Sequence, residues 1–190
     1  MFDRMKSMLT ERGMRSAVAP LLRRFLRSRD AVAGVEFAFV ATPFVALAFG
    51  VIQTGLMFLS SQSLVQAAAV AGRLIMTGQA QTAGWSSAQF QAQVCNQVAT
   101  MFNCASNVYI DVETYSSFSA INTGLPISGG ALNTGAMGYN PGGPGSIVMV
   151  RLYYQYPVFF GGPLQLSTLS NGDSLLAATA VFQNEPYASS

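Results

Sequence analysis

Side chains able to carry acid–base chemistry are scarce in this sequence. It contains no histidine, the usual acid–base residue near neutral pH. A paired-carboxylate site would have to draw on a small set: Asp111, Glu113, Asp173 and Glu185. Asp111 and Glu113 lie two residues apart in a predicted strand, so both carboxylates point to one face, about 7 Å apart. We interpret this pair as a solvated strand face, and we predict no catalytic site, no enzymatic activity and no cofactor.

One further carboxylate, Glu36, stands just inside a long apolar run. A carboxylate in such a place costs free energy, on the order of 1–3 kcal/mol depending on its depth in a membrane. It either lies at the headgroup boundary and is tolerated there, or it meets a positive charge. A freed N-terminal amine, of its own chain or of a neighbouring chain, would supply that charge.

Two cysteines, Cys95 and Cys104, occur in the segment CNQVATMFNC. A disulfide between them would close a loop of about ten residues and stabilise the fold by about 2.7 kcal/mol on the chain-entropy model. A tetrahedral metal site needs more ligands than two cysteines in a chain without histidine. A thiol oxidoreductase would have two residues between its cysteines. We therefore predict a structural disulfide and no metal site.

The element that must position Glu36 is the apolar run itself. Residues 37–59 contain no charge. As a helix they would extend about 35 Å, enough to cross a hydrocarbon core of about 30 Å. The buried helix of a soluble core is the alternative, although such helices are usually shorter. Gln53 and Thr54 interrupt the run near its far end, and Pro43 lies inside it, where a proline can kink a helix.

Charge is distributed unevenly about this run. Residues 1–30 carry eight basic and three acidic side chains, a net charge of +5, whereas residues 31–190 carry two basic and five acidic ones, a net charge of −3. By the positive-inside rule, the N-terminus stays in the cytoplasm and the rest is exported. Nucleic-acid binding is the other reading of a basic segment, but its position beside a membrane span makes a topology signal the simpler explanation. Ordinary signal-peptide cleavage near the alanines at 67–71 remains open.

Helical periodicity continues beyond the apolar run. Small and aliphatic residues recur at spacings of three and four and therefore share one helix face: Leu64, Ala67, Ala68, Ala71, Leu74, Ile75 and Gly78. The polar residues Gln62, Gln66 and Arg73 fall on another face. This pattern predicts one helix of over 40 residues that ends near Met76, with Gly78 as its stop.

A second helix and a small sheet are predicted after it. The helix begins at Ser86 or Ser87, with Ser87 as the cap, and ends at Phe102; its apolar positions are Phe90, Val94, Val98 and Met101. The period then changes to two in NVYIDVETY, which predicts a strand. The segment SIVMVRLYYQY predicts a strong strand, able to pair antiparallel with a last one near residues 176–182. Its tyrosines, with Phe159 and Phe160, are interpreted as core and interface.

Residues 122–146 are rich in glycine and proline and predict a long irregular loop, which in a small domain is usually flexible or functional. These glycines do not form a phosphate-binding loop, because they do not follow a strand, open a helix or accompany a lysine.

Several segments together resemble the TadE/TadG-like family of the tight adherence (Flp) pilus system. They are GVEFAFVATPF, GVIQTGLMF, AAAVAGRLIMTGQ, VYIDVETYSSF, VMVRLYYQYP and VFQNEPY. The resemblance covers residues 30–187, and its most specific parts are the VEFA-to-proline segment and the terminal NEPY.

This resemblance implies a minor pilin or pseudopilin that takes part in assembly of a type IV-class pilus and in cell adhesion. A prepilin peptidase would cut between Ala31 and Val32, which makes Glu36 the fifth residue of the mature chain. The family usually has glycine before the cut, where this chain has Ala31. Cutting would remove the basic leader and expose an amine beside Glu36. Without a cut, the protein is a static single-span anchor.

The predicted fold is therefore α+β: a long N-terminal transmembrane helix that extends into a small exported, pilin-like domain with a second helix and a short antiparallel sheet. We predict a basic cytoplasmic leader at 1–31, a transmembrane helix at 32–59 and the exported domain at 60–190. The expected partners are the bacterial inner membrane, other pilins, pilus-assembly proteins and the prepilin peptidase, but no nucleic acid. The alternative function is an envelope-anchored adhesin or binding module outside any pilus.

Overall fold

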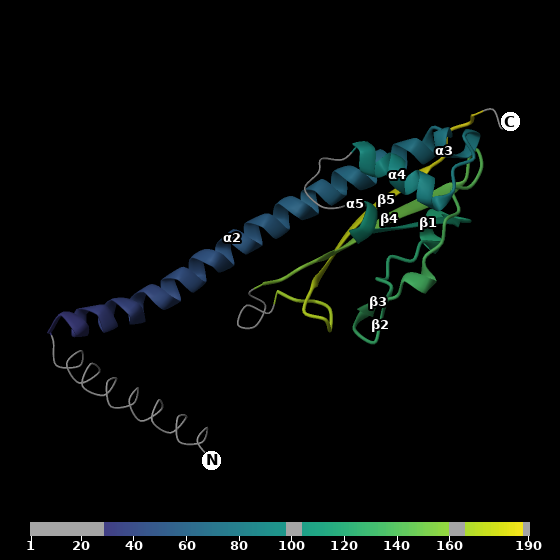
Figure 1. Cartoon of the computed structure of the whole chain (residues 1–190). Helices are drawn as coiled ribbons and strands as arrows, with labels where there is room; N and C mark the ends of the chain where they lie inside the picture. Colours follow the sequence, from purple (N-terminus) through teal and green to yellow (C-terminus); the bar gives the residue numbers. More distant parts are fainter. Residues whose placement is uncertain (1–28, 98–103, 160–165, 188–190) are drawn as a thin grey trace, which may run out of the picture. The chain divides into compact units, whose positions relative to one another are not determined.

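The computed structural model describes residues 29–97, 104–159 and 166–187. The chain divides into two compact units, one ending at Phe49 and the other beginning at Gly50. The architecture is α+β, as predicted (Figure 1). In chain order the elements are α2 Arg29–Met76, α3 Gln79–Thr82, α4 Ser87–Gln97, α5 Cys104–Asn107, β1 Val108–Tyr115, η1 Phe118–Ala120, β2 Ile127–Ser128, β3 Ala131–Leu132, η2 Thr134–Ala136, β4 Ile147–Tyr156 and β5 Ser174–Gln183.

Helix α2 is 48 residues long and ends at Met76, which confirms the predicted single long helix. At its end the N–H of Thr77 donates to the carbonyl of Arg73 (3.1 Å), and Gly78 then adopts a left-handed backbone with φ of 75°. A residue with a Cβ atom is disfavoured in that conformation, so Gly78 stops the helix as predicted.

One face of α2 is buried against the sheet of its own chain. The predicted apolar stripe is confirmed, because each member is at most 6% exposed: Leu64, Ala67, Ala68, Ala71, Leu74 and Ile75. A Cβ atom added at Gly72 would lie 3.1 Å from the ring of Phe182 and 3.4 Å from Ala180. The small residues on this face therefore let β5 approach the helix closely.

The main sheet has the order β1-β4-β5, and both pairings are antiparallel. The predicted pairing of the last two strands is confirmed over the full length of β5, from Ile147 opposite Gln183 to Tyr156 opposite Ser174. Alternate β4 residues, among them Val150 and Leu152, join the α2 stripe in one buried core. The period-two pattern of the sequence thus translates into one face of a sheet packed on a helix.

Helix α4 begins with a reciprocal cap at Ser86, one residue before the predicted cap at Ser87. The N–H of Ser86 donates to Oε1 of Gln89 (2.9 Å), and the N–H of Gln89 donates to Oγ of Ser86 (3.4 Å). This is a capping box, so Ser86 is the cap and the helix starts at Ser87. Phe90 and Val94 are fully buried, as their spacing predicted. The predicted end of this helix at Phe102, with Val98 and Met101, lies outside the described residues.

The glycine- and proline-rich segment 122–146 is more ordered than the sequence predicted. It contains the β2–β3 pair, the short helix η2 and a parallel bridge between Val112 and Tyr139. The side chain of Asn184 donates to the carbonyls of Pro141 (3.0 Å) and Gly143 (2.9 Å). These bonds fasten the segment to the end of β5.

The C-terminal residues after β5 connect that strand to the end of α2. The N–H of Glu185 donates to the carbonyl of Met76 (2.9 Å), one of the carbonyls that a helix end leaves unpaired. The ring of Tyr187 lies against Gly78, where an added Cβ atom would come within 2.4 Å of it. The terminal NEPY segment therefore has a structural part in closing the domain.

Candidate functional site: an exposed apolar helix with one carboxylate

The N-terminal part of α2 exposes large apolar side chains. Five of them are between 66% and 77% exposed: Phe37, Phe39, Val40, Phe44 and Leu47. The most apolar stretch has a mean hydropathy of 2.1, and only 6% of it is buried. A contiguous apolar surface of this kind marks contact with a membrane or a partner. This helix is long and apolar enough to serve as a single-pass membrane anchor.

Hydroxyl groups along this helix bond to the backbone of the preceding turn. Oγ1 of Thr42 donates to the carbonyl of Ala38 (2.7 Å), and Oγ1 of Thr54 donates to the carbonyl of Gly50 (2.9 Å). Such bonds satisfy polar atoms that would find no water within a bilayer. The polar interruptions of the run are thus compatible with an apolar environment.

Glu36 is an exposed residue of α2. It is the only charged side chain between Asp30 and Arg73. Both ion pairs found among the described residues involve Arg151, so Glu36 is in neither of them. If this helix lies in a membrane, Glu36 would bind a cation from another molecule strongly, because the dielectric constant there is low.

The predicted cut between Ala31 and Val32 falls within the described part of α2. Glu36 follows Ala31 by five positions, about one and a half helical turns. Most of the predicted basic leader, residues 1–28, lies outside the described residues.

The carboxylates of β1 do not form the solvated face that we predicted. Asp111 is 1% exposed, and its Oδ2 accepts from Arg151 Nη2 (2.6 Å) and Nε (3.0 Å). Its Oδ1 accepts from the N–H of Gly138 (2.9 Å). Glu113 is partly exposed and lies 3.4 Å from Arg151 Nη2. The prediction was wrong because strand alternation alone does not show that segment 122–146 covers this face.

Arg151 connects the sheet to that covering segment. Its Nη1 donates to the carbonyls of Gly124 (3.0 Å) and Asn122 (3.3 Å). Burial alone would lower the pKa of Arg151, but the hydrogen bonds that it donates to Asp111 and the surrounding negative charges outweigh that effect and raise the pKa. The ion pairs and hydrogen bonds of this cluster therefore tie β1 and β4 to segment 122–146.

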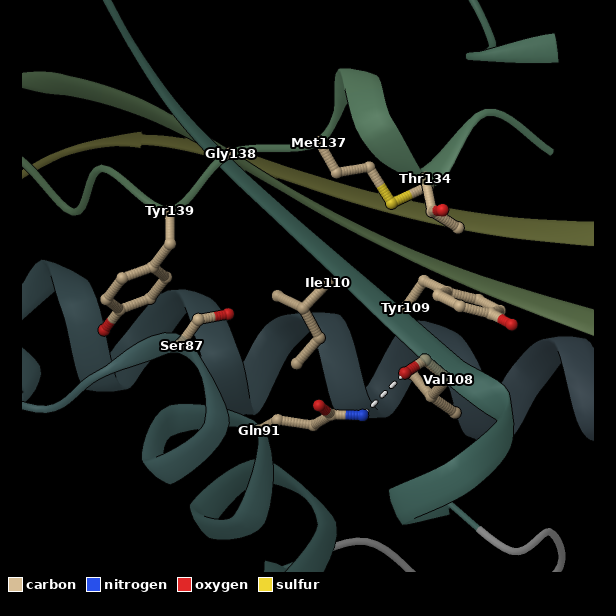
Figure 2. A pocket seen from close by; sticks show the side chains of 9 residues that line it. All are labelled: Ser87, Gln91, Val108, Tyr109, Ile110, Thr134, Met137, Gly138 and Tyr139. Carbon is tan, nitrogen blue, oxygen red and sulfur yellow. Dashed lines mark hydrogen bonds between the residues drawn. The ribbon is translucent and has the colours of Figure 1, made fainter. Parts of the chain in front are cut away.

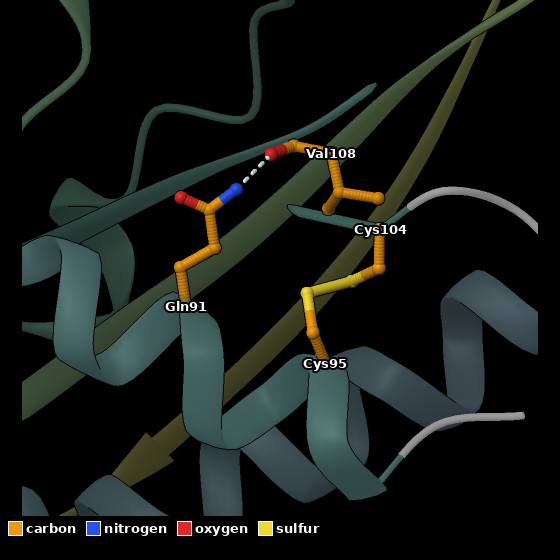
Figure 3. The surroundings of a disulfide bond; sticks show 4 residues. All are labelled: Gln91, Cys95, Cys104 and Val108. Atoms are coloured by element: carbon orange, nitrogen blue, oxygen red, sulfur yellow. Dashed lines mark hydrogen bonds between the residues drawn. A yellow bond between two sulfur atoms is a disulfide. The ribbon is translucent and has the colours of Figure 1, made fainter. Parts of the chain in front are cut away.

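The predicted disulfide is present in the structure. Cys95 on α4 and Cys104 at the start of α5 are joined, with their Cα atoms 5.6 Å apart (Figure 3). Close by, Nε2 of Gln91 donates to the carbonyl of Val108 (2.7 Å), a second tie between α4 and β1. The disulfide and this hydrogen bond hold the helix beside the edge strand.

A pocket of about 460 Å³ opens beside β1, and the sequence had not indicated it. Figure 2 shows Ser87 and Gln91 of α4 facing residues of β1, with loop residues completing the wall. The lining residues carry no formal charge: Ser87, Gln91, Val108, Tyr109, Ile110, Thr134, Met137, Gly138 and Tyr139. Burial raises the pKa of Tyr139 to about 12. No periodic pattern places Thr134 to Tyr139 here, since they come from an irregular segment.

Within the described part of the chain, no group of three or more histidine, cysteine, aspartate or glutamate side chains is placed to hold a metal ion.

Comparison with known families identifies the exposed helix. The family model described as TadE-like protein matches residues 32–73, which include Glu36, the apolar run and most of the buried stripe of α2. No curated protein and no solved structure matches the chain. Residues 32–73 are thus a TadE-like segment, and the resemblance that the sequence motifs indicated is confirmed there. The C-terminal motifs, including NEPY, lie outside the matched residues.

Proposed function

We propose that this protein is a membrane-anchored minor pilin or pseudopilin that takes part in assembly of a tight adherence pilus. One observation carries the proposal: the TadE-like segment coincides with a helix whose apolar side chains are exposed over its N-terminal part. Outside a membrane or a helix bundle, those side chains would face water at a large cost. The role is structural and not enzymatic.

The proposed topology follows from charge. The leader, with its net charge of +5, stays in the cytoplasm, and the domain after the span lies in the periplasm of a bacterial cell. The Cys95–Cys104 disulfide supports export, because disulfides persist in oxidising compartments.

Glu36 has a specific task in this proposal. A prepilin peptidase cuts between Ala31 and Val32, and the new amine of one subunit pairs with Glu36 of its neighbour. The pair gives register to helices whose contact is otherwise apolar and would slide. The family match includes Glu36, the residue that this pairing requires.

Deletion and complementation in the native host test the proposal. We expect loss of surface pili on deletion, and their return when the full chain is restored. Photo-crosslinkers placed at Phe39, which is 77% exposed, should capture other pilus subunits in the membrane fraction. Unchanged piliation in the deletion strain would contradict the proposed role.

A second function, an envelope-anchored adhesin or binding module, is favoured by one observation, the uncharged pocket beside β1. The same deletion strain separates the two functions. A binding module predicts intact pili and reduced attachment to surfaces, whereas an assembly component predicts that the pili are lost.

A further inference from the structure

The connection that leaves β4 begins with an unusually exposed aromatic side chain. Phe159 is 80% exposed, more than any other large apolar side chain in the described ranges, those of the apolar helix included. Val158, directly before it, packs against the buried core. Phe159 is therefore an exposed side chain that directly follows a residue packed against the core.

The sequence around Phe159 is free of charge. No charged residue occurs between Arg151 in the middle of β4 and Asp173 just before β5. The 16 residues 157–172 that follow β4 thus carry no charge, whereas water-exposed stretches usually include charged residues. Lipid contact requires this lack of charge, because a charge costs several kcal/mol in the hydrocarbon region.

The β4–β5 pairing and the hydrogen bond at Met76 together indicate which residues of α2 are level with the end of β4, just before Phe159. All of these residues belong to the unit that begins at Gly50. Glu185 binds Met76 at the end of the helix, and β5 runs back from there towards Ser174, its last pairing with β4. Ten strand residues span about 33 Å, which corresponds to about 22 helix residues. Counting back from Met76, the end of the β4–β5 pair is level with α2 residues near 54.

Burial on the helix agrees with this level. Gln53 and Ser60 are only 5% and 6% exposed, so the domain covers that side of α2 back to Gln53. On the remaining sides, Val51 and Phe58 are 72% and 62% exposed. Phe159, three residues after the end of β4, is thus placed by this register level with residues of the uncharged run 37–59 that belong to the unit beginning at Gly50.

We propose that Phe159 is a second membrane contact, which enters the boundary between headgroups and acyl chains of the same bilayer that α2 crosses. The proposal rests on the membrane anchoring proposed above and adds a contact by the exported domain. Aromatic side chains favour this boundary. Two contacts, the helix and Phe159, would fix the rotation of the domain about the helix axis, which a single span leaves free.

Tryptophan fluorescence of the full chain in liposomes tests this contact. The single native tryptophan is removed by Trp85→Phe, and one reporter is introduced at a time as Phe159→Trp, Phe118→Trp or Phe44→Trp. Phe118 is the matched control, because it is an aromatic side chain that is 56% exposed at the opposite end of the sheet from Phe159. It follows Tyr115 of β1, which pairs with Ile147 at the start of β4. Phe44 reports on the anchor itself. Vesicles of phosphatidylcholine and phosphatidylglycerol carry bromine at defined depths of the acyl chain.

We expect the reporter at 159 to show blue-shifted emission and at least twofold quenching by shallow bromine, with little change at 118. Quenching at 44 but none at 159 beyond the level at 118 would overturn the second contact and leave the anchor standing. Absence of quenching at both 44 and 159 would overturn the anchor as well as the contact.

Discussion

At the scale of single residues, the two carboxylates Asp111 and Glu36 differ in burial and in pairing. Asp111 was interpreted as solvated, yet it is buried and paired with Arg151. Glu36 remains exposed among apolar side chains. The signal that could have indicated the buried pair was the single arginine in the otherwise uncharged strand IVMVRLYYQY, because a cation there requires a buried anion.

Replacing Glu36 tests its role in register. We expect Glu36→Gln and Glu36→Ala to reduce piliation about tenfold or more, since a lost contact of about 1.4 kcal/mol is already a tenfold effect. Membrane insertion should be unchanged, because both variants make the span less polar. Thr42→Val is the matched control, as it alters a polar residue of the same helix without removing charge. Piliation is counted by electron microscopy, and normal piliation in both Glu36 variants would contradict the pairing.

Replacing Arg151 tests the buried cluster. Arg151→Met leaves Asp111 buried without its cation, and we expect a loss of about 3–5 kcal/mol in the free energy of unfolding. Adding Asp111→Asn to this variant removes the stranded charge and should recover part of the loss. Urea unfolding of the full chain in detergent measures both. Equal stability of the single and double variants would show that no charge is stranded.

At the scale of elements, hydrophobic periodicity predicted most of the fold. The α2 stripe and the two long strands follow from spacings of three to four and of two, which reflect helix and sheet geometry directly. The cap of α4 was misplaced by one residue because Ser86 and Ser87 are chemically equivalent, and only the reciprocal bond with Gln89 distinguishes them. The order within 122–146 was missed because long-range bonds, such as those of Asn184, have no local sequence signal.

The close contact between Tyr187 and Gly78 at the end of α2 allows a matched pair of glycine variants. Gly78 and Gly84 both have a left-handed backbone, with φ of 75° and 62°, so alanine costs each about 1–2 kcal/mol. Only at Gly78 does the new Cβ atom also meet the ring of Tyr187, whereas nothing lies within 4 Å at Gly84. We therefore expect Gly78→Ala to lower the melting temperature clearly more than Gly84→Ala. Equal shifts would contradict the packing of Tyr187 on the helix end.

At the scale of the whole molecule, stability should fall in alkali. Burial raises the pKa of both Tyr139 and Tyr153 to about 12, from about 10 in the unfolded chain. Both groups are neutral in either state below pH 10, so their contribution is complete there. Between about pH 10 and 12 only the unfolded chain loses these protons, and stability declines. Melting temperatures across this range measure the effect; a constant value up to pH 12 would contradict the burial of both rings.

The long helix contains the TadE-like segment and continues into an α+β domain, which is closed by a disulfide and by the residues that follow β5. The sequence predicted the anchor and the small sheet from length and periodicity. It did not predict the pocket or the exposed position of Phe159, since both depend on which loops meet at the ends of the sheet.

The mass of the intact protein purified from the membranes of its native host tests the central claim most directly. A processed pilin-like subunit predicts a chain that begins at Val32, with Glu36 as its fifth residue and the two cysteines oxidised. Peptidase-deficient cells should retain the full-length chain. A mature protein that still begins at Met1 in normal cells would contradict the account and leave only a static membrane anchor.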